Sequence, residues 1–259
     1  MNALFAKSGE SFAPDALPHT WNALDGQDGG SDYWRGTGSY KIELPAPIPG
    51  KHQYIQFEGA NHIAAVRCNG KLLGEHKGGF STFRYELTDA LQPTGNELTV
   101  EVSNPVCDVY PQMADFTFYG GLYRAVSLIE VENAHFDLLK DGTAGVFVTP
   151  NVAGKTRLDL FPVCAEGCSV IVSILDAEGK QVVAKTVDAE EHTVLVLDVK
   201  EPHLWNGVKD PYCGAFGPIV AIKTMQPSVP LMDFLPQVGN LPAGGMSYIN
   251  SQLNLIPKE

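Results

Sequence analysis

Residues 40–44 read YKIEL, in which apolar and charged side chains alternate, and the stretch stops at Pro45. Alternation with a period of two predicts a β-strand that buries one face, and a proline ends such a strand because it lacks a backbone donor. The same alternation returns in residues 83–87, FRYEL, and 98–102, LTVEV. Asn69-Gly70 closes a further apolar run and is the dipeptide that best fits a type I′ hairpin turn. The first part of the chain is therefore predicted to consist of short strands joined by tight turns.

Strand signals of the same kind continue in the second part of the chain. They lie at residues 145–149, 157–161, 170–175, 181–187 and 193–199. Residues 176–180, DAEGK, supply the polar turn of a hairpin between two of them. No window of the sequence carries the sustained apolar stripe of period 3.6 that marks an amphipathic helix. The pattern predicts an all-β protein of two sandwiches in series.

The predicted domain boundaries follow changes in this pattern. The first sandwich spans residues 1–131, the second spans 132–212, and residues 213–259 form an irregular C-terminal tail. Six prolines interrupt every apolar run of the tail, and a proline inside a ladder removes a hydrogen-bond donor. We expect the tail to lack the closing strand of the second sandwich and to descend from a shift of reading frame, because back-translating residues 223–234 in a shifted frame permits an alternating strand.

The charge balance limits the partners of this chain. It has 259 residues, with 30 acidic against 18 basic side chains and a formal net charge of −12. A surface for nucleic acid or anionic membrane needs an excess of Lys and Arg, so both are poor partners. No stretch approaches the roughly 18 consecutive apolar residues of a membrane span, and residues 1–12 carry charges instead of a secretory apolar core. We therefore expect a cytoplasmic protein.

The cysteines and histidines predict neither a disulfide framework nor a metal site. Five cysteines at irregular spacing are typical of reduced thiols. Cys164 and Cys168 flank a turn, but zinc would need two further ligands, and the seven histidines show no His-x₃-His pattern. Nucleotide-binding, serine-hydrolase and zincin motifs are also absent from the sequence. We expect no metal and no cofactor.

Five motifs follow one another in the first part of the chain. They read LPHTWN at 17–22, DYWRGTGSY at 32–40, NG at 69–70 with GGF at 78–80, GNEL at 95–98, and DFTFYGGLYR at 115–124. In order and spacing they resemble the N-terminal region of the family 2 glycoside hydrolases, which include β-galactosidases, β-glucuronidases and β-mannosidases. Residues 132–212 resemble, less specifically, the immunoglobulin-like domain that follows, with LW at 204–205 and DPY at 210–212.

The resemblance implies a jelly-roll sugar-binding domain, an immunoglobulin-like sandwich and, in the complete enzyme, a (β/α)₈ barrel that carries two catalytic glutamates. Only 47 of the 259 residues follow Tyr212, whereas such a barrel needs roughly 250. We therefore expect the non-catalytic N-terminal portion of a β-galactosidase-like glycosidase, inactive alone, with a carbohydrate, a β-glycoside, as its partner. A free-standing carbohydrate-binding module and a purely structural fragment are the alternatives. The sugar, and any homo-oligomer of the complete enzyme, stay open.

Asp115 is the first candidate for contact with a sugar. The resemblance implies that it reaches from the jelly roll into the active site of the complete enzyme and binds sugar hydroxyls. A carboxylate suits this role because it accepts two strong hydrogen bonds from neighbouring hydroxyls. The alternative is a turn aspartate that accepts from loop amides. Asn104, Asp108 and Tyr110 lie on the loop that leads to Asp115 and belong to the same hypothesis.

Several other residues have a structural interpretation beside the functional one. Trp34 and Arg35 lie in a Gly-rich loop, where they either contact a sugar or cover the core and brace the loop, and we favour the structural role. Arg124 is expected to anchor its loop through a carboxylate. Asn96-Glu97 imitates the acid/base motif of the family, but its place before an alternating strand predicts a solvent-facing hairpin shoulder.

Overall fold

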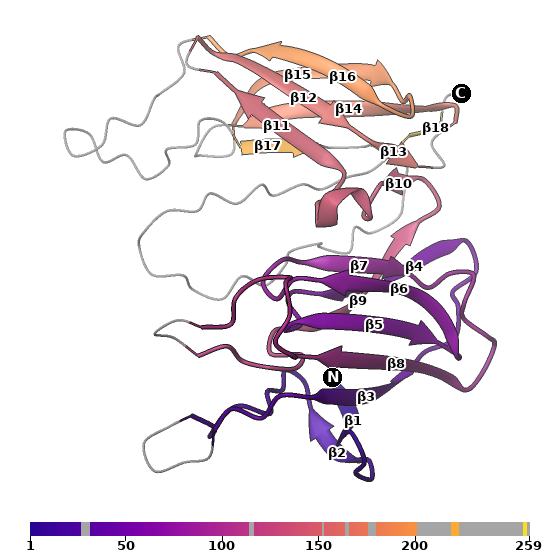
Figure 1. The fold of residues 1–259 in the computed structure, drawn as a ribbon. Coiled ribbons are helices and arrows are strands. Elements are labelled where there is room, and N and C mark those ends of the chain that lie inside the picture. Colours follow the sequence, from indigo (N-terminus) through magenta and orange to yellow (C-terminus); the bar gives the residue numbers. More distant parts are fainter. Residues whose placement is uncertain are drawn as a thin grey trace. The chain divides into compact units, whose positions relative to one another are not determined.

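The computed structural model of the protein describes residues 1–26, 32–113, 117–151, 153–163, 166–175 and 180–200, together with the backbone of 219–222 and 256–257. The chain divides into two compact units, Met1–Glu132 and Asn133–Glu259 (Figure 1). The regular structure of the described residues is β apart from one 3-10 helix, η1 (Lys140–Gly142). The prediction of an all-β protein is confirmed. No helix in this described part is long and apolar enough to cross a membrane.

The first unit consists of two antiparallel sheets (Figure 1). One has the strand order β2-β1-β3-β8-β5-β6, and the other has the order β7-β4-β9. The strands are β1 (Asn2–Lys7), β2 (Ala13–Ala16), β3 (Thr37–Leu44), β4 (Lys51–Phe57), β5 (Ile63–Cys68), β6 (Lys71–Lys77), β7 (Phe83–Glu86), β8 (Asn96–Ser103) and β9 (Val126–Glu132). β3 and β8 pair along their whole length, which places both at the centre of the larger sheet.

The core of the first unit draws its side chains from both sheets. In β3, Tyr40, Ile42 and Leu44 are buried, and the residues between them are more exposed. From the smaller sheet, Phe57 is fully buried and stacks on Phe83 with 4.8 Å between the ring centroids. Burying an apolar side chain of this size stabilises a fold by about 1.5–3 kcal/mol. The alternation read from residues 40–44 thus gives the correct inward face of the strand.

The predicted hairpin at Asn69-Gly70 joins β5 to β6. Both residues have a positive φ, 51° and 82°, as a type I′ turn requires. The Asn69 side chain makes further bonds: Nδ2 donates to the Ala90 carbonyl at 2.9 Å and to Asn96 Oδ1 at 2.8 Å, and Oδ1 accepts from the Glu97 amide at 3.0 Å. The turn is therefore tied to the start of β8.

The second unit is a smaller β-sandwich. Its sheets have the orders β11-β12-β16, β15-β14-β17 with β18 also paired to β14, and β10-β13. The strands are β10 (His135–Phe136), β11 (Val146–Pro150), β12 (Lys155–Leu160), β13 (Pro162–Val163), β14 (Cys168–Leu175), β15 (Gln181–Asp188), β16 (Thr193–Asp198), β17 (Ile219–Ile222) and β18 (Ile256–Pro257). Buried residues of the two larger sheets, such as Leu158, Val172 and Leu195, form one core. The finer jelly-roll and immunoglobulin-like assignments stay predictions.

Two differences from the predicted elements concern sheet edges. β1 and β2 were not expected, because NALFAK does not alternate and Pro14 and Asp15 are poor strand formers. The expectation that no strand follows residue 212 is wrong for Ile219–Ile222 and Ile256–Pro257, which pair with β14. The first of these segments contains no proline and is rich in β-branched residues. The other residues of 201–259, and the predicted turn at 176–179, lie outside the described residues.

Candidate functional site

The loops of the first unit are joined to one another by side-chain hydrogen bonds. We call this region the loop end and define it as residues 17–26, 32–36, 58–62, 78–82, 104–113 and 117–125. It contains every sequence-predicted site residue of the described part. Asp115 lies outside the described residues, so its two interpretations both stay open.

Asn22 joins three segments of the loop end. Its side chain is almost fully buried, and its Oδ1 accepts from the Gly120 amide at 2.9 Å. Its Nδ2 donates to Asp25 Oδ2 at 2.8 Å and to the Trp34 carbonyl at 3.3 Å. Asp25 Oδ2 also accepts from the Trp34 amide at 3.0 Å. The buried amide thus replaces the backbone ladder that these irregular segments lack.

Asn104 makes a second junction of the same kind. It is 2% exposed, and its Oδ1 accepts from the Gly36 amide at 2.9 Å, while its Nδ2 donates to the Trp34 carbonyl at 3.2 Å. Its own amide donates to the Gly36 carbonyl at 3.0 Å. The structure therefore shows Asn104 bracing the loop, and contact with a sugar stays a prediction for this residue.

The two charged candidates of the described part are exposed. Arg35 is exposed and donates from Nη2 to the Gln112 carbonyl at 3.4 Å, and Asp108 is exposed on the neighbouring loop. The structure brings Arg35 next to the loop that holds Asp108 through this bond. Trp34 packs on the core of the unit and meets Trp21 edge to face at 5.3 Å between centroids. Trp34 therefore covers the core, as its structural interpretation expects, and contact of its partly exposed ring with a sugar stays a prediction.

His62 and Tyr110 contact each other in the loop end. The sequence predicted a role for Tyr110 but not for His62. His62 is fully buried, and its ring meets the Tyr110 ring edge to face at 4.7 Å. The Tyr110 hydroxyl donates to Asn61 Oδ1 at 2.7 Å, and burial raises the pKa of Tyr110 to about 12. Burial also lowers the pKa of His62, with a smaller contribution from the positive charge of Arg35. Both rings are therefore neutral near pH 7, and no motif in the sequence marks His62.

The predicted roles of two charged residues, Arg124 and Glu97, can be compared with their contacts in the structure. Arg124 does anchor its loop, but its Nη1 donates to the Phe80 carbonyl at 3.0 Å, and no ion pair of Arg124 occurs among the residues that the structure describes. A carbonyl thus satisfies one guanidinium donor, and a carboxylate partner of Arg124 stays a prediction. Glu97 lies on the solvent side of β8 and pairs with Lys41 at 3.1 Å. Its prediction as a solvent-facing residue is confirmed.

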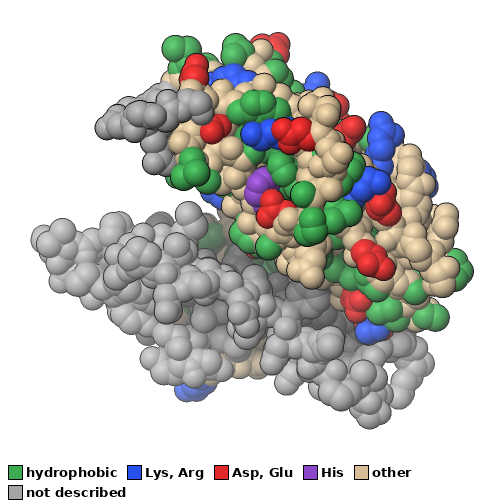
Figure 2. Space-filling view, turned by 90° about the horizontal axis from the view of Figure 1, so that it is seen from below, with side chains coloured by type: hydrophobic (Ala, Val, Ile, Leu, Met, Phe, Trp, Pro, Cys, Tyr) green, Lys and Arg blue, Asp and Glu red, His purple; other side chains and the backbone are tan. Residues whose placement is uncertain are grey.

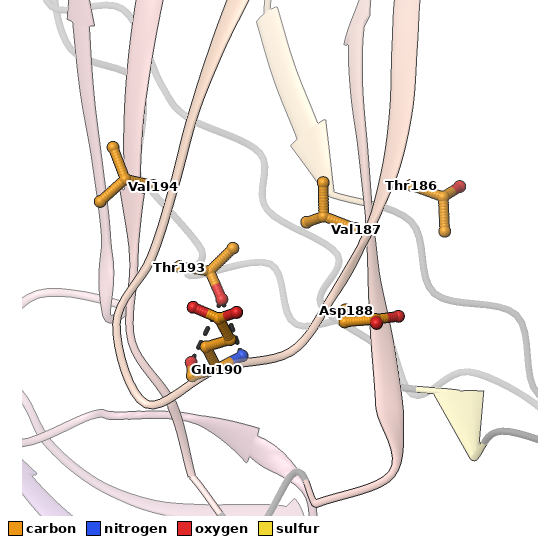
Figure 3. Close-up of a pocket in the computed structure, with 6 residues that line it drawn as sticks. All are labelled: Thr186, Val187, Asp188, Glu190, Thr193 and Val194. Carbon is orange, nitrogen blue, oxygen red and sulfur yellow. Dashed lines mark hydrogen bonds between the residues drawn. The ribbon is translucent and has the colours of Figure 1, made fainter.

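A pocket of the second unit offers fewer free polar groups to a ligand than the loop end does. Thr186, Val187, Asp188, Glu190, Thr193 and Val194 line it (Figure 3). Thr193 Oγ1 accepts from the Glu190 amide at 2.9 Å and donates to the Glu190 carbonyl at 3.1 Å, so its hydroxyl is used to close the turn. No group of three or more metal-ligating side chains occurs in the described ranges. Cys164 lies outside them, and Cys168 is buried.

The charge on the surface is mixed. Figure 2 shows one face on which Lys and Arg side chains lie among Asp, Glu and hydrophobic ones. On the described part of this face, the Lys and Arg side chains form no continuous basic area.

The fold and these contacts define an all-β protein whose first sandwich presents a polar loop end held by buried amides. Residues 31–132 match the family described as "Glycosyl hydrolases family 2, sugar binding domain". The chain belongs to family 2 of the glycosyl hydrolases and corresponds to the N-terminal region of such a protein. The resemblance noted from the five sequence motifs is confirmed.

Several relatives are named as glycosidases. A β-glucuronidase of Bacteroides fragilis is 33% identical over 213 residues, which are 76% of this chain and 30% of that protein. A β-galactosidase of Thermoanaerobacter pseudethanolicus is 28% identical over 172 residues, 61% of this chain and 22% of that protein. The crystal structure of an FMN-binding β-glucuronidase from Facaelibacterium prausnitzii L2-6 is 38% identical with a TM-score of 0.70, and the match covers 78% of this chain and 33% of that one. The chain thus spans between 22% and 33% of the length of these relatives.

Proposed function

We propose that the first unit binds the carbohydrate part of a β-glycoside at its loop end, as the non-catalytic portion of a family 2 glycosidase. The match of residues 31–132 to the sugar binding domain of the family carries this proposal. The loop end supports it, because Asn22 and Asn104 hold the backbone around two exposed charged residues, Arg35 and Asp108. Rigid polar groups beside partly exposed aromatic rings suit a ligand with both hydroxyls and apolar ring faces.

The names of the relatives point to two sugars. The proteins compared above are named β-glucuronidases and a β-galactosidase, so we propose a β-glucuronide or a β-galactoside as the ligand. Arg35 favours the first, because a guanidinium matches a carboxylate with two parallel hydrogen bonds. In this scheme Asp115 and Asp108 accept hydrogen bonds from sugar hydroxyls.

We further propose that this chain does not hydrolyse glycosides by itself. Retaining hydrolysis needs a general acid and a nucleophile, two carboxyl groups about 5 Å apart. The glutamate that imitates the family motif, Glu97, is on the solvent face of β8 and is engaged with Lys41. Sugar positioning alone cannot replace these two groups.

Calorimetry with methyl β-D-glucuronide and methyl β-D-galactoside tests the binding, and aryl β-glycosides test the chemistry. We expect binding of at least one sugar and no hydrolysis above the uncatalysed rate. Asp115→Ala should weaken binding while leaving the melting temperature nearly unchanged, and Asn2→Ala, at an exposed position of β1, is the control. Turnover that disappears in Glu97→Gln would contradict the non-catalytic role. A large loss of stability in Asp115→Ala would instead support the alternative role as a turn residue.

A further inference from the structure

His19 joins the start of the loop end to a segment near its finish, residues 120–122, which we call the Gly-Gly-Leu segment. The backbone amide of His19 donates to the Leu122 carbonyl at 2.8 Å. Its ring Nδ1 is 2.8 Å from the Tyr40 hydroxyl, and the oxygen of that hydroxyl accepts from the Leu122 amide at 3.3 Å. The backbone of Leu122 is therefore held at its carbonyl by His19 and at its amide by Tyr40.

Asp15 determines which nitrogen of the neutral His19 ring carries the proton. Its Oδ2 is 3.3 Å from His19 Nε2, and a carboxylate can only accept a hydrogen bond. The proton therefore lies on Nε2, and Nδ1 accepts from the Tyr40 hydroxyl. A continuous chain of hydrogen bonds thus runs from the carboxylate through both rings to the amide of Leu122.

A second proton on the His19 ring does not fit this chain. Nδ1 then becomes a donor, so the Tyr40 oxygen would have to accept from both His19 and the Leu122 amide. The Tyr40 hydroxyl would lose its acceptor, and no other acceptor for it occurs among the residues that the structure describes. Tyr40 is fully buried, so solvent cannot replace the lost partner without a change of structure. Protonation of His19 therefore weakens the hold of Tyr40 on Leu122.

Charged and titratable groups of three strands act on His19. Burial lowers the pKa of His19 below its ordinary value of about 6.5, although Asp15 of β2 favours the protonated ring, and Lys7 of β1 adds to the lowering. Tyr40 of β3 stays neutral, because burial raises its pKa well above the ordinary range. The Gly-Gly-Leu segment itself carries no charged side chain. The ring is therefore neutral near pH 7 and gains its second proton in acid.

The Gly-Gly-Leu segment lies directly against the Tyr40 hydroxyl. A side chain at Gly121 would collide with that oxygen, and Gly121 has a φ of 100°, which a residue with a side chain rarely adopts. The candidate sugar ligand Asp115 stands six residues before Gly121 in the sequence. The hydrogen bonds that hold the Gly-Gly-Leu segment therefore also set where the stretch after Asp115 rejoins the sandwich.

We propose that His19 and Tyr40 position the Gly-Gly-Leu segment for carbohydrate binding, and that protonation of His19 releases the segment and weakens that binding. In the neutral state the Tyr40 hydroxyl donates to Nδ1 of His19 and accepts from the Leu122 amide. When a proton from solvent binds to Nδ1, this arrangement breaks and the segment loses one of its anchors. The effect on binding rests on the function proposed above, whereas the release of the segment does not.

Amide hydrogen exchange followed by NMR tests the release without any sugar. Protection factors are compared, because they correct for the intrinsic pH dependence of exchange. Between about pH 7.5 and about pH 5, where ordinary carboxylates stay ionised, we expect the Leu122 amide to lose at least about fivefold of its protection. The loss should follow the titration of the His19 ring signals. A constant protection factor, or a change that does not follow these signals, overturns the proposal.

Variants separate His19 from the other titrating histidines. In His19→Asn the side-chain oxygen replaces Nδ1 as the acceptor but does not titrate, so the protection of Leu122 should be the same at both pH values. His76→Asn is the matched control, because burial also lowers the pKa of His76, whose ring bonds to Ser81 instead. It should keep the response of the parent chain.

Tyr40→Phe removes the hydroxyl between His19 and Leu122 and should lower the protection of Leu122 at both pH values. Equal pH responses in His19→Asn and the parent chain contradict the role of His19. If Tyr40→Phe does not fold, the comparison of His19→Asn with His76→Asn still decides.

Calorimetry with methyl β-D-glucuronide and methyl β-D-galactoside at the same two pH values tests the link to the sugar. We expect the dissociation constant of the parent chain to rise at least about threefold in acid, and that of His19→Asn to stay constant. An affinity of the parent chain that does not depend on pH overturns the link to binding. If neither sugar binds at either pH, the function proposed above fails together with this link, and the exchange experiment still decides the release of the segment.

Discussion

The two units are both β-sandwiches, but they close their irregular segments in different ways. In the first unit, side-chain amides bond to backbone groups far away in sequence: Asn22 to Gly120, 98 residues apart, and Asn104 to Gly36, 68 residues apart. In the second unit, the described turns are closed by near neighbours, such as Thr193 and Glu190, three residues apart. A local turn only reverses the chain, whereas a long-range amide couples two loops. The first unit therefore has the better framework for a binding surface.

The largest expected effects test whether the two units have separate cores. Phe57→Ala in the first unit should cost about 3–5 kcal/mol, and Leu158→Ala in the second about 2–5 kcal/mol, because both residues are fully buried. Hydrogen exchange measured by mass spectrometry should show faster exchange only in the unit that carries the substitution. Equal acceleration in both units would contradict separate cores.

The next effect tests the long-range amides directly. Asn104→Ala leaves the Gly36 amide without its side-chain partner and removes one of the two amide donors to the Trp34 carbonyl, which should cost about 1–3 kcal/mol. Asn151→Ala removes an exposed local bond to the Ala153 amide and should cost less than about 0.5 kcal/mol. Denaturant unfolding measures both. Similar losses from the two variants would remove the distinction between the units.

As the pH is lowered, the first unit should lose stability at a higher pH than the second unit. Burial lowers the pKa of His19, His62 and His76 in the first unit. As the pH falls, these histidines therefore bind protons in the unfolded chain before they do so in the folded chain. That contribution to stability is complete above the unfolded value of about 6.5 and is lost as the pH falls below it.

In the second unit, hydrogen bonds from Arg157 first, and then from His192, lower the pKa of Asp159 to about 2. Its contribution is present above the unfolded value of about 3.9 and is lost as the pH falls through about 2. NMR signals of core methyl groups should therefore show the first unit losing stability at the higher pH. Asp159→Asn should flatten the acid response of the second unit only.

The smallest effect concerns surface charge. Glu97→Gln removes the ion pair with Lys41, in which both side chains are partly exposed, and should change the free energy of unfolding by about 0.2–1 kcal/mol. Thermal unfolding at low and high salt measures it, with the difference from the parent chain shrinking at high salt. A larger loss would indicate a structural role for Glu97 beyond this pair.

The sequence predicts strands well wherever one face is buried. Residues 40–44 alternate because β3 separates core from solvent, and the burial of Tyr40 and Ile42 follows from that pattern. β1 carries no such signal, because NALFAK does not alternate, and β2 carries none because the edge of a sheet accepts residues that a central strand rejects.

The loop end could be located from its motifs but not described in detail. Asn104 was proposed as a sugar ligand, because a loop asparagine looks the same in sequence whether it binds a ligand or a distant backbone group. Its actual partner is 68 residues away and is set by tertiary packing. His62 was overlooked for a similar reason, because its position between Gln112 and Cys107 arises only when two distant loops meet.

The Asn69-Gly70 turn has a consequence for the chemical ageing of the protein. In a flexible chain this dipeptide readily loses ammonia, because the glycine amide nitrogen attacks the asparagine side chain to form a succinimide. Here the carboxamide is held at both ends: Nδ2 donates to Ala90 and Asn96, and Oδ1 accepts from Glu97. The attack requires the side chain to leave these partners and turn toward Gly70. The same bonds that tie the turn to the start of β8 thus protect this asparagine from deamidation while the first unit stays folded.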